Sequence, residues 1–108
     1  MATSNVTSAQ LDAKFLAIIL NAVEEFKEIE QVVLFGSRAM KSQRQGSDID
    51  IALLGKNIDR SVVLRLHDFL NNQTIIPYFI DILDFNTISN PELIEHIQQN
   101  GLVIYERT

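Results

Sequence analysis

The feature that most constrains the fold is a short segment in which polar and apolar residues alternate around two acids, Gly46-Ser47-Asp48-Ile49-Asp50-Ile51. Alternation with a period of two is typical of a β-strand that has one buried face. Side chains two residues apart on a strand share a face, so Asp48 and Asp50 are predicted to project together, away from Ile49 and Ile51. Two unpaired carboxylates held side by side repel each other, so the pair favours a bound cation.

A second predicted strand lies upstream and ends in a glycine-serine turn. The apolar run Val32-Val33-Leu34-Phe35 stops at Gly36, and Ser37 follows, with one helical turn expected after it. A glycine lets the backbone approach a phosphate, and a serine hydroxyl or the free N–H groups of a starting helix can bind phosphate oxygens. Three of the nine Lys and Arg residues fall in the polar connection 37–47, namely Arg38, Lys41 and Arg44. The paired acids and a turn that can bind phosphate together indicate nucleotidyl transfer.

A third acid, Asp81, interrupts the apolar run of a third strand expected from Ile75 to Phe85. A carboxylate in such a run is costly unless it has a partner. If this strand lies beside the strand of Asp48 and Asp50, the three carboxylates converge on hard cations, and Mg²⁺ is the expected ion where phosphates complete its shell. Two ions would divide the work between activating the attacking oxygen and stabilising the leaving group. Asp84 would point to the opposite side and is expected to be solvated or to cap a turn.

Helical periodicity surrounds these strands. Three helices are expected: one capped by Ser8 with apolar residues from Leu11 to Phe26, one from Asp59 to about Asn71-Asn72, and one from Asn90-Pro91 to Gly101. His67 and His96 fall on the second and third helices and are expected at the surface. Leu102 to Tyr105 forms either a last strand or an extended tail, and residues 1–7 form a loose tail. The pattern predicts one α/β domain spanning residues 1–108.

Composition narrows the functional classes. A chain of 108 residues with 46% hydrophobic residues fits one globular domain. Its net charge of −5, from 9 basic and 14 acidic residues, argues against direct nucleic-acid binding, which needs excess positive charge. The absence of cysteine suits a reducing cytoplasm. The segment Met1 to Gln10 lacks the basic start of a secretory signal, and the apolar run Phe15 to Leu20 is too short for a membrane span. A cytoplasmic protein without membrane contact is expected.

The ordered segments Gly36-Ser37-Arg38-Ala39 and Gly46-Ser47-Asp48-Ile49-Asp50, followed by Asp81, resemble the motif of the polymerase-β-like nucleotidyltransferase superfamily. The resemblance runs from about Val32 to the C-terminus and is greatest to the minimal nucleotidyltransferase (MNT) antitoxins that pair with HEPN-domain toxins. It implies a small mixed β-sheet backed by helices. One departure stands out, because the family commonly has a basic residue and a glycine where this chain has Met40-Lys41, and Lys41 is expected to supply part of the missing charge.

The resemblance also implies roles for individual residues. Asp48, Asp50 and Asp81 would be catalytic acids and metal ligands for Mg²⁺, two ions being expected. Gly36 and Ser37 would contact the phosphates of ATP, with Ser47 as a further candidate. Arg38 is either a phosphate contact or a plain surface ion-pair partner.

The reaction expected from the resemblance transfers AMP from ATP to a hydroxyl acceptor, a tyrosine of a HEPN toxin, and thereby neutralises the toxin. The short chain has no room for a second substrate-binding domain, so a partner or a second copy would complete the acceptor site. Two alternatives stay open at this point. One is a non-catalytic antitoxin that silences its partner by binding, and the other is a nucleotidyltransferase that modifies a small molecule.

Overall fold

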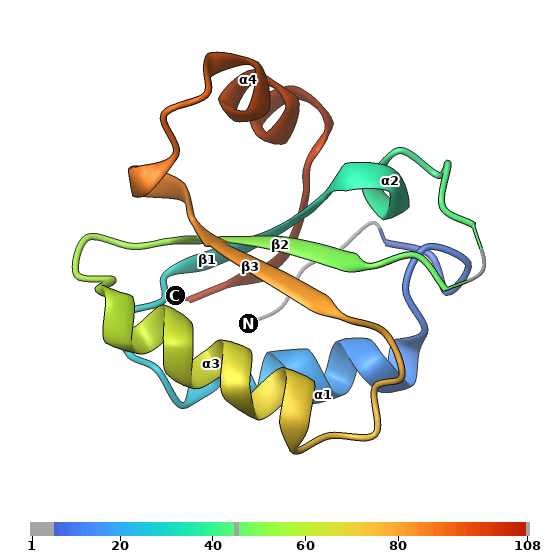
Figure 1. Ribbon diagram of the computed structural model, residues 1–108, viewed down its shortest axis with the longest axis horizontal. Helices are drawn as coiled ribbons and strands as arrows, with labels where there is room; N and C mark the ends of the chain where they lie inside the picture. The colour runs from blue at the N-terminus through green and yellow to red at the C-terminus, as the bar shows by residue number, and fades with distance from the viewer. Residues whose placement is uncertain (1–5, 45, 108) are drawn as a thin grey trace.

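The computed structural model describes residues 6–44 and 46–107, and it places four strands in one sheet with helices on both faces (Figure 1). The strands are β1 (Gln31–Phe35), β2 (Ile49–Leu54), β3 (Ile80–Asp84) and β4 (Leu102–Glu106), in the spatial order β3-β2-β1-β4. Strand β1 pairs antiparallel with β2 and with β4, whereas β2 and β3 run parallel. The predicted mixed sheet is therefore confirmed, and the segment after Gly101 is a strand rather than a tail.

The helices form two layers, one on each face of the sheet, and the layer that contains a four-residue helix is the thinner one. They are α1 (Ala13–Glu24), α2 (Gly36–Ala39), α3 (Arg60–Asn72) and α4 (Pro91–Asn100), with a short 3₁₀ helix η1 (Phe85–Thr87) after β3. Figure 1 shows α1 and α3 together on one face of the sheet, and α2 and α4 on the other. Helix α3 is the crossover that the parallel pairing of β2 and β3 requires. Of the helices in the described ranges, none combines the length and the hydrophobicity needed to cross a membrane.

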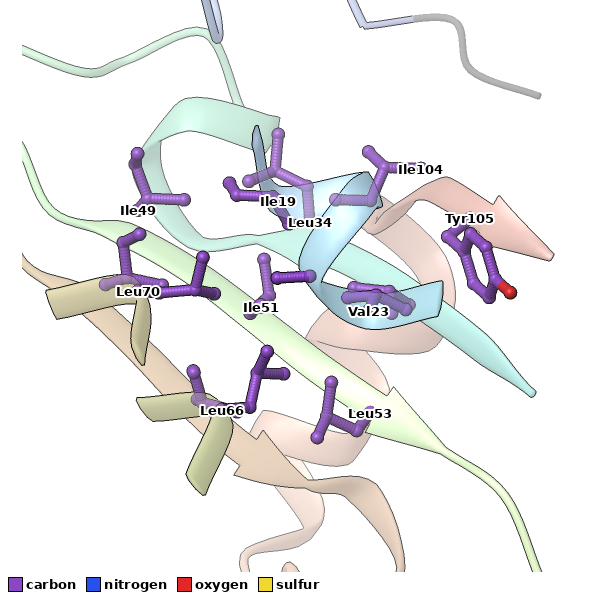
Figure 2. Close-up of a cluster of buried hydrophobic side chains, with 14 of the residues drawn as sticks. Ile19, Val23, Leu34, Ile49, Ile51, Leu53, Leu66, Leu70, Ile104 and Tyr105 are labelled. Carbon is purple, nitrogen blue, oxygen red and sulfur yellow. The ribbon is translucent and has the colours of Figure 1, made fainter. Parts of the chain in front are cut away.

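The main core lies between the sheet and the layer of α1 and α3. On β2 the alternating residues Ile49, Ile51 and Leu53 are completely buried. Figure 2 shows them facing side chains of α1 and α3, such as Val23 and Leu66. Each fully buried aliphatic side chain contributes about 1.5–3 kcal/mol relative to an exposed one, so this face holds the sheet to its helices.

The opposite face of the sheet has a smaller apolar cluster, made by Val33, Phe35, Ala52 and Ile97. Because side chains two apart on a strand share a face, Asp50 points to the same side as Ala52. Helix α4 covers this side only in part, and the side chain of Asp50 is half-buried. Asp50, the acid of β2, therefore faces the layer of α2 and α4.

Of the three predicted helix-capping residues at N-termini, two are confirmed and one is wrong. Asp59 accepts a hydrogen bond from the N–H of Val62 at 3.0 Å, and Asn90 accepts from Glu92 at 2.9 Å, so both residues cap their helices as expected. Ser8 does not cap α1. Asp12 does, through a 2.8 Å hydrogen bond from the N–H of Lys14.

The segment before α1 is folded where the structure describes it. Residues 7–11 form a turn in which the N–H of Gln10 donates to the carbonyl of Thr7 at 3.0 Å. In the expected loose tail, residues 1–5 lie outside the described part, whereas Val6 packs against the core and the N–H of Thr7 donates to Oε1 of Gln10. Val6 is thus held by its apolar contact, and Thr7 is held by its hydrogen bond to the buried side chain of Gln10.

Strand β3 is shorter than predicted and begins at Ile80 instead of Ile75. Pro77 has no N–H to donate to a ladder, which disfavours a strand through this position. The side-chain amide of Asn71 also bonds both the N–H of Ile80, at 2.8 Å, and its carbonyl, at 2.9 Å. This side chain from α3 fixes where the strand starts.

Candidate active site

The sheet register brings two of the three predicted acids together. Asp50 on β2 and Asp81 on β3 are direct partners in the parallel ladder. Partnered residues of adjacent strands project on the same face, so the two carboxylates stand abreast. Asp48 lies one residue before β2 and two before Asp50. On the other side of β2, Phe35 is the partner of Asp50, and therefore the turn at Gly36 follows directly beside it.

Gly36 lies against the carboxylate of Asp50. Its φ angle is +76°, a left-handed conformation that favours glycine. A Cβ added at this position would overlap Oδ2 of Asp50. Both the backbone angle and the contact therefore require glycine, and the predicted turn lies directly against Asp50, one of the predicted acids.

The surroundings of Asp50 perturb its titration. Burial raises the pKa of Asp50 above its usual value, and the negative charges of Asp81 and Asp48 raise this pKa further. The positive charge of Arg38, and that of His96 when it is protonated, acts on the same pKa in the opposite direction. A nearby cation stabilises the ionised form of a carboxylate that is partly desolvated and surrounded by like charges.

The carboxylates of the site suit a hard cation only when a ligand supplies further oxygen atoms to its coordination shell. In residues 6–44 and 46–107, no group of three or more His, Cys, Asp and Glu side chains is placed so that it could hold a metal ion. Asp50 and Asp81 offer carboxylate oxygens, which are the donors that Mg²⁺ prefers, and this ion usually completes its shell with phosphate oxygens and waters. The residues thus suit Mg²⁺ that arrives with a phosphate-bearing ligand.

Arg38 is buried and is held by backbone carbonyls. Its Nη1 donates to the carbonyl of Gln10 at 2.9 Å, its Nη2 to that of Ser47 at 2.8 Å, and its Nε is shared between the carbonyls of Ser47 and Asp48 at 3.2 Å each. The guanidinium also lies 4.6 Å from the ring centroid of Tyr78. Arg38 is therefore not a surface residue: it supports the backbone beneath the acids, and phosphate contact by Arg38 stays a prediction.

The two serines of the predicted site differ in their surroundings. Ser37 is half-buried in α2, where its carbonyl accepts a hydrogen bond from the N–H of Ser42 at 2.9 Å. The hydroxyl of Ser47 accepts from the N–H of Arg44 at 2.8 Å and closes the turn before β2. Ser47 thus has a structural bond in this conformation, and a contact between either serine and phosphate stays a prediction.

The sequence matches a family model described as "Polymerase beta, Nucleotidyltransferase" over residues 18–108. The chain belongs to this family. None of the curated proteins matches it.

Solved nucleotidyltransferase-fold structures share its architecture at low sequence identity. A toxin–antitoxin crystal structure with AMP-PNP has a chain that aligns with a TM-score of 0.69 and 21% identity, over 91% of this chain and 76% of that one. A tri-AMPylated Shewanella oneidensis HEPN toxin in complex with MNT antitoxin gives a TM-score of 0.66 and 19% identity, over 87% and 71% of the two chains. The toxin–antitoxin MntA-HepT gives 0.65 and 19%, over 87% and 72%. These similarities establish the nucleotidyltransferase fold.

The departure from the family pattern at Met40-Lys41 has a structural counterpart. Lys41 is the non-glycine residue with positive φ in the described part of the chain, and its φ of 60° lies in the left-handed region. A glycine would adopt this angle without strain. The turn therefore has, at Lys41, a backbone conformation that favours glycine.

Two further polar residues turn out differently from each other. Asp84 accepts a hydrogen bond from the N–H of Asn86 at 3.0 Å and begins η1, so it caps a turn as predicted. His96, predicted to lie at the surface, is half-buried, and its Nε2 accepts a hydrogen bond from the N–H of Gly36 at 3.0 Å. The signal for this position was its spacing, because His96 follows Leu93 by three residues and precedes Ile97 on the sheet-facing side of α4.

Proposed function

We propose that this nucleotidyltransferase transfers AMP from ATP to a hydroxyl group of a HEPN-domain toxin, a tyrosine, and acts in this way as its antitoxin. The observation that carries the proposal is the junction of the turn and the acids: Asp50 is in register with Asp81 on one side and touches Gly36 on the other. A phosphate at the turn would lie next to carboxylates that need a cation. The similarity to chains of toxin–antitoxin structures, one with AMP-PNP and one with an AMPylated HEPN toxin, supports the donor and the acceptor.

In the proposed reaction the hydroxyl oxygen of the acceptor forms a bond to the α-phosphorus of ATP. The bond from that phosphorus to the bridging oxygen of the β-phosphate breaks, pyrophosphate leaves, and the hydroxyl proton passes to a carboxylate of the site. Asp48, Asp50 and Asp81, together with the phosphate oxygens of ATP, would hold Mg²⁺, as two ions, whose charge would activate the hydroxyl and offset the charge of the triphosphate. Gly36 and Ser37 would place the phosphates, so the protein contributes mainly position and electrostatics.

The thin helical layer over the acids fits a partner that brings its own acceptor. Helix α4 and the four-residue α2 cover this face, and the acids stay partly exposed beside them. A hydroxyl on a second protein could approach from the uncovered side. The net charge of −5 supports a protein acceptor over a nucleic-acid acceptor.

Intact-mass spectrometry of the HEPN-type partner, after incubation with this chain, ATP and Mg²⁺, tests the proposal. We expect a gain of one or more AMP units that is lost when the chain carries both Asp48→Ala and Asp50→Ala. Asp68→Asn is the matched control, because it removes an exposed carboxylate from α3, away from the site. An unchanged mass, with the partner still silenced by the double variant, would leave a binding antitoxin in place of an enzyme.

A further inference from the structure

We infer that His96 of α4 is a positioning residue for the glycine-serine turn, an inference that rests on the proposed nucleotidyl transfer. The observation is the 3.0 Å hydrogen bond from the N–H of Gly36 to Nε2 of His96, which joins residues 60 positions apart in the chain. It ties the C-terminal helix to the turn that contacts Asp50. The side chain is half-buried, and its ring packs edge-on against Phe35, with the ring centroids 6.2 Å apart.

The hydrogen bond defines the state of the imidazole. A ring nitrogen that accepts an N–H has a free lone pair, so the proton of the neutral ring resides on Nδ1. Nδ1 lies 3.5 Å from the side-chain amide of Asn100, one helical turn along α4, and because a protonated Nδ1 donates, this tautomer pairs with the amide oxygen of Asn100 when the amide group is turned to face it. Because Nε2 is engaged by Gly36 and Nδ1 carries the proton, the ring has no lone pair left to accept a proton from an attacking hydroxyl. The geometry therefore favours positioning over base catalysis for His96.

The bond acts on the position that has the least freedom in the site. The N–H of Gly36 belongs to the peptide group that joins β1 to α2, and Gly36 itself lies against Oδ2 of Asp50. A rotation of this peptide would move the Gly36 backbone relative to the carboxylate and would redirect the start of α2. By accepting the N–H, His96 holds the turn in the conformation in which it lies against Asp50 and can bind the phosphates. The turn is thus preorganised, and the energy of ligand binding is not spent on ordering it.

Three variants separate this role from simple packing. His96→Leu keeps the apolar contact with Phe35 but cannot accept the N–H, whereas His96→Gln places an amide oxygen near the position of Nε2. Gln99→Leu is the matched control, since it adds the same side chain at an exposed position of α4. The loss of one ordinary hydrogen bond corresponds to about a fivefold change in an equilibrium constant. We therefore expect Mg²⁺–AMP-PNP to bind about fivefold more weakly to His96→Leu, and within about twofold of wild type to His96→Gln and Gln99→Leu.

The hydrogen bond itself has a readout that does not depend on activity. In ¹⁵N-labelled wild-type protein, an N–H···N bond gives a scalar coupling between the Gly36 amide nitrogen and Nε2 of His96, and absence of this coupling would overturn the inference. Equal AMP-PNP affinity of His96→Leu and wild type would also overturn it, as would a His96→Gln variant as weak as His96→Leu. Wild-type protein that binds no AMP-PNP would instead refute the proposed function itself.

Discussion

At the scale of single residues, Gly36 has the strictest steric requirement in the site, with its φ of +76° and its contact with Oδ2 of Asp50. We expect Gly36→Ala to abolish nucleotide transfer and to lower the free energy of unfolding by about 2–3 kcal/mol. A left-handed alanine costs about 1–2 kcal/mol, and the carboxylate must also move away. Urea unfolding and the mass-spectrometric transfer assay measure the two effects.

Gly46 provides the control for this prediction. Its φ is +84°, but a Cβ at Gly46 would meet nothing within 4 Å. Gly46→Ala therefore introduces the backbone strain alone, which costs about 1 kcal/mol. Equal losses of stability and transfer in the two variants would mean that the contact with Asp50 contributes nothing.

Lys41 is a residue in a glycine's conformation, with its φ of 60°. Lys41→Gly should raise the free energy of unfolding by about 1 kcal/mol, because the left-handed strain disappears and outweighs the greater flexibility of the unfolded chain. Lys41→Ala removes the same charge but keeps a Cβ, so it should give no such gain in thermal or urea unfolding. If both variants stabilise the protein equally, the lysine charge and not the backbone angle is the unfavourable feature.

Asp50 links the site to pH. Because the folded protein raises the pKa of Asp50 above the unfolded value of 3.8, the folded state binds more protons than the unfolded state between these two values. The associated stability is fully present below pH 3.8 and is lost as pH rises through the folded pKa. In Mg²⁺-free buffer, Asp50→Asn should therefore be more stable than wild type at pH 7, with an advantage that shrinks as pH falls through this window. A wild-type protein as stable as the variant at pH 7 would contradict the prediction.

At the scale of elements, the start of β3 depends on one side chain of α3. Asn71 bonds the N–H and the carbonyl of Ile80 on the edge strand, in the place where a further strand would pair. Asn71→Leu should cost about 2 kcal/mol, because two partly buried backbone groups lose their partner. Asn72→Leu is the control, since Asn72 is exposed and its side chain donates to Asp68. Urea unfolding compares the two variants, and equal losses would show that the bonds to Ile80 are not the cause.

The same element shows why boundaries were harder to predict than elements. Alternation identified β2, and helical spacing with a capping residue identified α3 and α4, because these signals are local. The start of β3 is set by Asn71, which is nine residues away in the chain. Ser8 and Asp12 are both good capping residues, and only the turn at residues 7–11 selects Asp12.

At the scale of the whole molecule, the site gathers segments that no local pattern connects. The order of the glycine-serine turn, Asp48, Asp50 and Asp81 was enough to predict a shared site, because a sheet aligns strand positions in register. The contact of His96 with Gly36 requires α4 to pack back over β1, which depends on the complete chain. The buried position of Arg38 was not predictable either, because its partners are backbone carbonyls, which the sequence does not distinguish.

Arg38 also joins segments from different parts of the molecule, since its guanidinium bonds carbonyls of the N-terminal segment and of the turn before β2. Arg38→Lys should lower the free energy of unfolding by about 2–3 kcal/mol, because one ammonium group cannot reproduce the fork of a guanidinium toward three carbonyls. Arg60→Lys, on the exposed start of α3, is the control. Both variants can be compared by urea unfolding.

Gln10 and Arg38 bond each other in both directions. The side-chain amide of Gln10 donates to the carbonyls of Arg38 and Ala39, and the backbone carbonyl of Gln10 accepts from the guanidinium of Arg38. The effects of Gln10→Ala and Arg38→Lys should therefore not add, with a coupling of about 0.5–3 kcal/mol in a double-mutant cycle. Additive effects would contradict a shared cluster. A measured coupling would mean that residues 7–11 stabilise the backbone of Asp48 through Arg38. Removal of these residues should then weaken nucleotide transfer.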